Sequence, residues 1–200
     1  MSEYKKKYPW LKIYDPYPEE GESDDFDPSM WIPEGWVKTL WEPMCEDLDR
    51  EIKAANLQDE FRILELKEKY SEMRIFCHPS TPAIDDITRT YEALSSSICQ
   101  YCGSIEGVKM TNFGWVISCC RNCFQKLNGN HNLDKFDALP TEELQNTLKW
   151  IRYSKNGNEH FEIDISETTQ KIRERYAQRK ANGEFKDNPF DEWEDDYYGA

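Results

Sequence analysis

The stretch Cys99-Gln-Tyr-Cys102, separated by seventeen residues from Cys120-Arg-Asn-Cys123, decides the fold of this 200-residue chain. Two Cys-x2-Cys pairs at this separation have the spacing of a four-cysteine zinc site. Zn²⁺ prefers four tetrahedral ligands, and two tight turns that each carry two thiolates can complete that shell from opposite sides. The sequence therefore predicts a structural zinc ion bound by Cys99, Cys102, Cys120 and Cys123.

The neighbouring residues favour this prediction over its alternatives. Gly103 follows the first pair and suits a turn that folds back under a metal. Cys119 offers a second register, but Cys120 with Cys123 repeats the spacing of the first pair. Buried free thiols or a disulfide would not explain two matched pairs, and Met1–Lys7 leads into no hydrophobic export signal. A closed four-thiolate site leaves no coordination position for a substrate, so the motif predicts a structural role in folding rather than a catalytic one.

The net charge of −14 is concentrated in two segments. Residues 15–34 hold eight acids and no base, and residues 183–200 hold seven acids against Lys186. These two segments account for the whole net charge. The balance disfavours long-range attraction to nucleic acid, because phosphate contacts need clustered Lys and Arg.

Hydrophobic periodicity predicts an α+β fold. A four-residue recurrence predicts an amphipathic helix over residues 35–56, which Pro43 should bend or interrupt. Alternation predicts two strands within residues 61–77, joined near Tyr70-Ser71-Glu72. A helix over residues 81–98 follows, with Thr81 and Pro82 at its start.

The cysteine pairs are expected to hold a short hairpin of residues 108–110 and 115–118, followed by a helix over residues 121–128. Farther on, we predict a helix over residues 140–153, a strand over 161–165 and a helix from Ser166 to about Ala181. That last helix is basic, and would either fold against acidic segments or contact phosphates. Its cations are Lys171, Arg173, Arg175, Arg179 and Lys180.

The order of these segments resembles a family of small, largely uncharacterised bacterial and phage proteins with a KEKFGGLRFY box, then C-x2-C-G, then G-W-x-x-T-x-C. Here the box reads Lys67-Glu-Lys-Tyr-Ser-Glu-Met-Arg-Ile-Phe76, and an upstream Gly35-Trp36 matches as well. The later pieces are Cys99–Gly103 and Gly114–Cys120. The resemblance covers roughly residues 34–125 and implies a fold and a metal site. It implies no activity, so it carries over no catalytic residues.

This sequence departs from the family pattern in the box. Ser71-Glu72 stands where the family has two glycines, so the turn between the strands lacks the freedom of glycine at positive φ. Ser118 stands where threonine is usual in the later segment.

The C-terminal segment mixes acids with aromatics, and such segments suit docking into a basic, partly apolar groove. The alternative is a solubilising tail. The N-terminal segment, which is also acidic and aromatic, would either pack on the domain or bind a partner. The residues predicted to contact a partner are Asp191, Trp193, Glu194, Asp195, Asp196 and Tyr197.

The expected organisation is a small zinc-stapled domain with a two-stranded hairpin, flanking helices and acidic arms at both ends. Its parts are an acidic-aromatic arm (1–34), a zinc-binding core (35–128), a helical extension (129–182) and an acidic-aromatic tail (183–200).

No catalytic constellation is apparent in the sequence. A zinc nuclease of the His-Asn-His type places a histidine between its cysteine pairs, whereas His78, His131 and His160 all lie elsewhere. The motifs of zinc deaminases, phosphate-binding loops and nucleophile elbows are absent. We therefore expect a protein without enzymatic activity.

The sequence leaves two candidate functions. The first is an interaction protein whose carboxylates imitate nucleic-acid phosphates and bind a basic protein surface. Together with the resemblance to bacterial and phage proteins, this first hypothesis predicts a phage or mobile-element product that inhibits a host nucleic-acid-handling protein, or an immunity-type protein. The alternative is a nucleic-acid-binding zinc module that uses Lys109, Arg121, Lys126 and the basic helix 171–180. With no apolar run of membrane-spanning length, we expect a cytoplasmic protein, in the host cytoplasm if phage-encoded, and no membrane partner.

Overall fold

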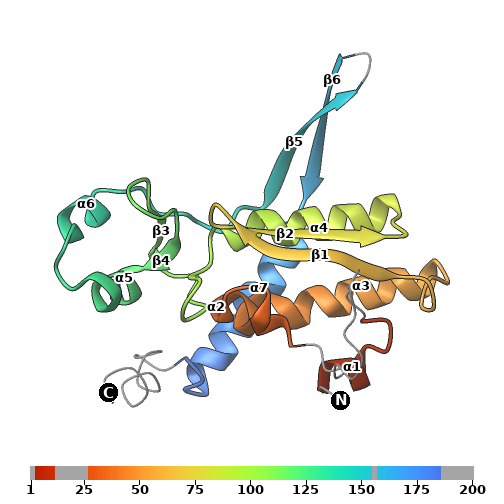
Figure 1. The fold of residues 1–200 in the computed structure, drawn as a ribbon, viewed down its shortest axis with the longest axis horizontal. Helices are drawn as coiled ribbons and strands as arrows, with labels where there is room; N and C mark the ends of the chain where they lie inside the picture. The colour runs from red at the N-terminus through yellow and green to blue at the C-terminus, as the bar shows by residue number, and fades with distance from the viewer. Residues whose placement is uncertain (1–2, 12–26, 155–156, 186–200) are drawn as a thin grey trace, which may run out of the picture.

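The computed structural model describes residues 3–11, 27–154 and 157–185 (Figure 1). The fold is α+β, as predicted, with small two-stranded antiparallel sheets and helices around them. Within these residues, no helix combines the length and the apolar character needed to cross a bilayer.

The helix predicted over residues 35–56 is confirmed, with an irregular first part. It runs through α2 (Glu34–Trp36), a π-helical turn η2 (Val37–Trp41) and α3 (Glu42–Ala54). Pro43 has no N–H to donate to the carbonyl of the residue four positions earlier, and the widened turn accommodates this loss. The inward face of this helix is fully buried and forms the centre of the main core. Its largest members are Trp36, Leu40, Trp41, Met44, Leu48 and Ile52.

The two predicted strands pair as β1 (Arg62–Lys69) and β2 (Glu72–His78), with a bulge between Ile63 and Glu65. Helix α4 (Pro82–Ser95) packs against β2 and α3 and closes the core. Its N-cap is Thr81, which accepts a hydrogen bond from the N–H of Ile84. The predicted helix thus ends three residues before the expected boundary.

The segment between residues 99 and 139, here called the cysteine lobe, lies at one end of the molecule (Figure 1). It contains strands β3 (Val108–Met110) and β4 (Ser118–Cys120), and helices α5 (Arg121–Asn128) and α6 (Leu133–Asp137). The helix over 121–128 is confirmed. The predicted hairpin is present, but its second strand is Ser118–Cys120 and overlaps the expected 115–118 only at Ser118. A separate small hydrophobic cluster fills the lobe, and in it the rings of Phe124 and Phe136 stack with centroids 4.3 Å apart.

The prediction of a helix over residues 140–153 was wrong. Residues Thr147–Ser154 form strand β5, which pairs in register with β6 (Gly157–Asp164), and this hairpin projects away from the body (Figure 1). The segment Thr147–Ser154 is rich in aromatic and β-branched residues, and the apolar spacing of so short a run fits either structure. The following segment supplies a complete hydrogen-bonding partner, which decides in favour of the strand. The predicted strand over 161–165 corresponds to the end of β6.

Helix α7 (Ser166–Ala181) has the predicted bounds and returns to the body of the protein. Ile165 and Ile172 belong to the main core, so the C-terminal part of the chain packs with residues 35–98. The described N-terminal residues do the same. After helix α1 (Glu3–Lys7), the side chains of Tyr8, Trp10 and Leu11 are buried in this core.

The turn between β1 and β2 is strained and anchored. Tyr70 and Ser71 have φ of 53° and 64°, in the left-handed region where hairpin turns usually place asparagine or glycine. Ser71 is fully buried, and its hydroxyl donates a 2.6 Å hydrogen bond to the hydroxyl of Ser118, next to the second cysteine pair. Its N–H donates to the Glu68 carboxylate at 2.7 Å. The tip of the hairpin is therefore tied to the cysteine lobe.

This geometry predicts opposite effects at the two turn positions. Tyr70 is 72 % exposed, so Tyr70→Asn should relieve backbone strain and raise the free energy of unfolding by about 0.5 kcal/mol. Ser71→Ala keeps the strain and leaves the buried Ser118 hydroxyl without its donor, which should cost about 1–3 kcal/mol. Denaturant unfolding measures both. In the double variant with Ser118→Ala, the loss should be smaller than the sum of the single losses; additive losses would contradict a direct bond.

Candidate metal centre

The structure brings together the four predicted cysteines. The Sγ atoms of Cys99, Cys102, Cys120 and Cys123 all lie within 4.8 Å of one another. Those of Cys102 and Cys120 are 3.7 Å apart, and two sulfurs about 2.3 Å from one tetrahedral zinc ion would lie roughly 3.8 Å apart. Cys119 is buried but is not part of this group, so the chosen register is confirmed.

The first cysteine pair lies on a turn whose backbone is closed by hydrogen bonds. The N–H of Gly103 donates to the carbonyl of Cys99 at 3.0 Å, and the N–H of Cys99 donates to the carbonyl of Ser104 at 2.8 Å. Gly103 has φ of 79°, which a residue with a side chain rarely adopts. The turn can therefore present Cys99 and Cys102 to the same point.

The second pair lies where a strand becomes a helix. Cys120 is the last residue of β4 and the N-cap position of α5, and Cys123 lies in the first turn of α5. The N–H of Gln100 donates to the carbonyl of Ser118 at 2.9 Å, which joins the two turns directly. Local strand, helix and turn geometry thus converges on one four-sulfur site.

The first turn packs backbone to backbone on the start of helix α2. The N–H of Gly35 donates to the carbonyl of Gln100 at 2.9 Å, and a Cβ at Gly35 would lie 2.1 Å from the Cys99 carbonyl oxygen. The hydroxyl of Thr39 donates to the carbonyl of Gly103 at 2.7 Å. Only a residue without a side chain fits at position 35. Sequence reasoning noted Gly35-Trp36 as part of the family pattern and did not foresee this contact.

The indole of the next residue adds a further bond to the same segment. Trp36 is fully buried, and its Nε1 donates to the carbonyl of Ile98 at 3.1 Å. The helix that forms the centre of the main core therefore also holds the chain on which Cys99 lies.

The thiols influence one another's ionisation. The hydrogen bond with Cys102 lowers the pKa of the Cys120 thiol, and the same contact raises the pKa of Cys102, because one thiolate opposes the ionisation of its neighbour. A divalent cation at the centre would remove this opposition and allow all four sulfurs to bind as thiolates. The donor set fits a soft, tetrahedral ion such as Zn²⁺, which would hold the two turns together as a structural element.

The cations proposed to contact nucleic acid are hydrogen-bonded within the protein. On α7, Lys171 lies 3.0 Å from Asp47, and Arg175 lies 2.5 Å from Glu46. Burial opposes ionisation of Glu46, but its bonds with Arg175 and Lys171 lower the pKa of that carboxyl. At these two positions the basic helix folds against acidic residues of α3, whereas Arg179 and Lys180 pair with Glu184 and Glu106.

The cations near the cysteines show the same pattern. Lys109 donates to the carbonyls of Asp137 and Leu139, at 2.6 and 2.8 Å. Arg121 forms an ion pair with the carboxylate of Asp137 at 2.8 Å. The residues predicted to bind a partner, Asp191, Trp193, Glu194, Asp195, Asp196 and Tyr197, lie outside the described residues.

A metal-binding test can use the two adjacent cysteines as a matched pair. Cys120→Ser removes a ligand, so metal content measured by mass spectrometry should fall and the cysteine lobe should lose stability, because metal-binding free energy is also folding free energy here. Cys119→Ser changes a buried thiol next to the site and should keep one ion per chain. Removal of metal with a chelator should reproduce the Cys120→Ser phenotype. A fully folded, metal-free Cys120→Ser protein would contradict the assignment.

The close contact at Gly35 gives a second prediction. The expected change in the free energy of unfolding is opposite to the change that helix propensity predicts. Propensity alone would make Gly35→Ala stabilising by about 0.5–1 kcal/mol. The collision with the Cys99–Gly103 turn should instead lower the free energy of unfolding by about 1–3 kcal/mol and weaken metal retention. Glu34→Ala, at the exposed position before it, is the control and should change little. Stabilisation by Gly35→Ala would show that the two backbones are not in contact.

Comparisons with known proteins add no assignment to this geometry. The chain matches no protein-family model, no curated protein and no solved structure. The four-cysteine site therefore stands on its spacing, its sulfur–sulfur distances and its backbone contacts.

Proposed function

We propose that this chain is a non-enzymatic, zinc-stapled interaction protein that binds a protein partner with a basic surface. The four clustered thiolates would complete the coordination shell of one structural Zn²⁺ and leave no position for a substrate. In this proposal the metal holds a binding surface in shape and takes no part in a reaction.

The observation that carries the proposal is the presentation of Trp115 by the loop between β3 and β4. The side chain of Trp115 is 90 % exposed. Its backbone is nevertheless fixed, because the buried Thr111 hydroxyl donates to the Trp115 carbonyl at 2.6 Å and accepts from the N–H of Ile117 at 2.9 Å. A large exposed aromatic side chain on an ordered loop is typical of an interface anchor, since it buries much area at little entropic cost.

The charge of the chain supports a basic partner. The net charge is −14, and the α7 cations Lys171 and Arg175 bind acids of the same chain. Electrostatic complementarity would speed association with a positive surface. We propose the acidic-aromatic tail as a second contact beside Trp115.

The resemblance to bacterial and phage proteins favours a specific form of this proposal, an inhibitor of a host nucleic-acid-handling protein. A nucleic-acid-binding zinc module is the alternative. The hydrogen bonds of Lys109 and the Arg121–Asp137 ion pair count against it, because these cations would have to give up partners within the chain to contact phosphates.

The proposal predicts that a protein partner is still recovered after nuclease treatment. The tagged full chain should recover one protein from nuclease-treated lysate of its native or host cell, and that protein should bind directly when purified. Trp115→Ala should weaken this binding by roughly tenfold or more, as at an interface hot spot. Met30→Ala, which removes another exposed side chain, should leave it unchanged.

Neutralisation of four tail acids should slow association and reduce its salt dependence. A control that neutralises four exposed acids elsewhere should have a smaller effect. Recovery of nucleic acid before nuclease and of nothing after it would favour the alternative function. The tail variant changes Asp191, Glu194, Asp195 and Asp196, and the control changes Asp59, Glu60, Asp134 and Glu167.

A further inference from the structure

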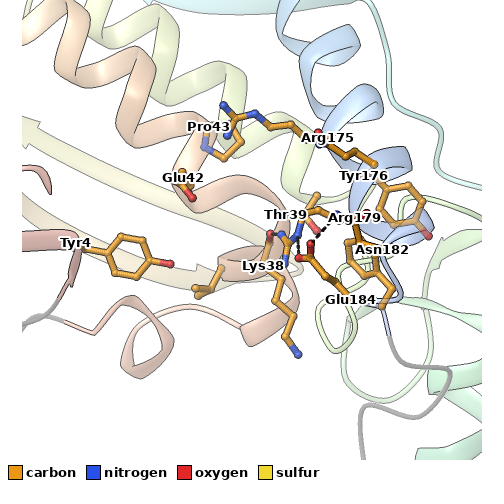
Figure 2. Close-up of a pocket in the computed structure, with 13 residues that line it drawn as sticks. Tyr4, Lys38, Thr39, Glu42, Pro43, Arg175, Tyr176, Arg179, Asn182 and Glu184 are labelled. Atoms are coloured by element: carbon orange, nitrogen blue, oxygen red, sulfur yellow. Dashed lines mark hydrogen bonds and ion pairs between the residues drawn. The ribbon is translucent and has the colours of Figure 1, made fainter.

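A cavity of about 600 Å³ lies between α1, the π-helical turn η2 and the C-terminal end of α7 (Figure 2). Its size is in the range of cavities that hold organic ligands or peptide side chains. Tyr4 lies on one side, and Tyr176 and Arg179 of α7 lie on the other, as Figure 2 shows. None of the four clustered cysteines lines it, so this is a second site.

The chain itself already enters this cavity at the end of the described residues. The ring of Phe185 lies 4.6 Å from the ring of Tyr176, and the Arg179 guanidinium lies 5.2 Å from the Phe185 ring centre. The Nε of Arg179 also donates to the Glu184 carboxylate at 2.7 Å. An acidic residue and the aromatic residue after it therefore bind α7 through an arginine–carboxylate pair and ring contacts.

The remaining fifteen residues of the chain repeat this acidic-aromatic pattern. Asp191-Glu192-Trp193 and Asp195-Asp196-Tyr197 each place an aromatic residue directly after carboxylates. Fully extended, residues 186–200 reach at most about 50 Å from Phe185. This length is ample for a second aromatic residue to return to the same cavity.

The charge of the lining fits such a segment. Apart from Glu184, the cavity is lined by three cations and one acid, Glu42. Of the cations, Lys38 pairs with the exposed Glu34 at 2.5 Å, a surface contact that a further carboxylate can join. The three cations are Lys38, Arg175 and Arg179.

We propose that residues 186–200 dock in this cavity of their own chain, with an aromatic side chain inside and carboxylates beside Lys38. The docked tail would be withheld from other proteins, and a basic partner would have to displace it. This inference goes beyond the proposed function, because it concerns the isolated chain and is tested without a partner.

Zero-length cross-linking of the full chain with a carbodiimide tests the contact. Mass spectrometry of the monomeric fraction should find amide links between Lys38 and carboxylates of residues 191–196. Lys53 is the matched control, because it also pairs with an acid four residues away on a helix, Asp49 at 2.7 Å. Its side chain is 59 % exposed against 35 % for Lys38, so solvent exposure alone would favour links at Lys53. Links at Lys38 should exceed those at Lys53 several-fold.

A second measurement uses charge reversal and limited proteolysis with chymotrypsin. Lys38→Glu should increase the rate of cleavage after Phe190 and Trp193 several-fold, and Lys53→Glu should leave it unchanged. Equal cross-linking of both lysines, links found only in a covalent dimer, or unchanged cleavage in Lys38→Glu would each overturn the proposal. Failure here would leave partner binding through Trp115 untouched, so the two proposals fail separately.

Discussion

The contact between Gly35 and the Cys99–Gly103 turn is the constraint on which the rest of the structure depends. Two backbone segments meet there without an intervening side chain, and the Gly35 N–H bonds the Gln100 carbonyl between the first two cysteines. On one side of this contact lies the helix that fills the main core with Trp36. On the other side lies half of the four-sulfur site. Because neither segment can shift without the other, the four-sulfur site and the hydrophobic core are structurally coupled.

A second connection reaches the cysteine lobe from the β1–β2 hairpin. The buried Ser71–Ser118 hydrogen bond lies next to the second cysteine pair, and it holds a turn whose backbone angles are unfavourable for serine. Such strain persists only where surrounding contacts compensate for it. The lobe is thus held at one turn by a helix and at the other by a hairpin, which explains how so small a hydrophobic cluster keeps one arrangement.

Local patterns in the sequence predicted most of this fold. The cysteine spacing predicted the four-sulfur site, Thr81 and Pro82 predicted the start of α4, and the basic helix α7 was found with its correct bounds. The strand β5 was mistaken for a helix because its partner strand, and not its own pattern, decides its structure. The Gly35 contact and the Ser71–Ser118 bond escaped prediction for a similar reason. Both join residues far apart in the chain, and nothing in the spacing of either segment indicates the other.

The long-range contact at the first turn also sets an order of events during biosynthesis. Thr39 and Gly103 are 64 residues apart, so the ribosome needs about 3–13 seconds after adding one before it adds the other. For most of that interval the Trp36 indole lacks its hydrogen-bond acceptor, the Ile98 carbonyl, and the last cysteines come later still. If the four-sulfur site binds a metal ion, as proposed, its capture would be among the final steps of maturation. In a cell short of that metal, newly made chains would then present the Trp36 indole to chaperones and proteases for longer.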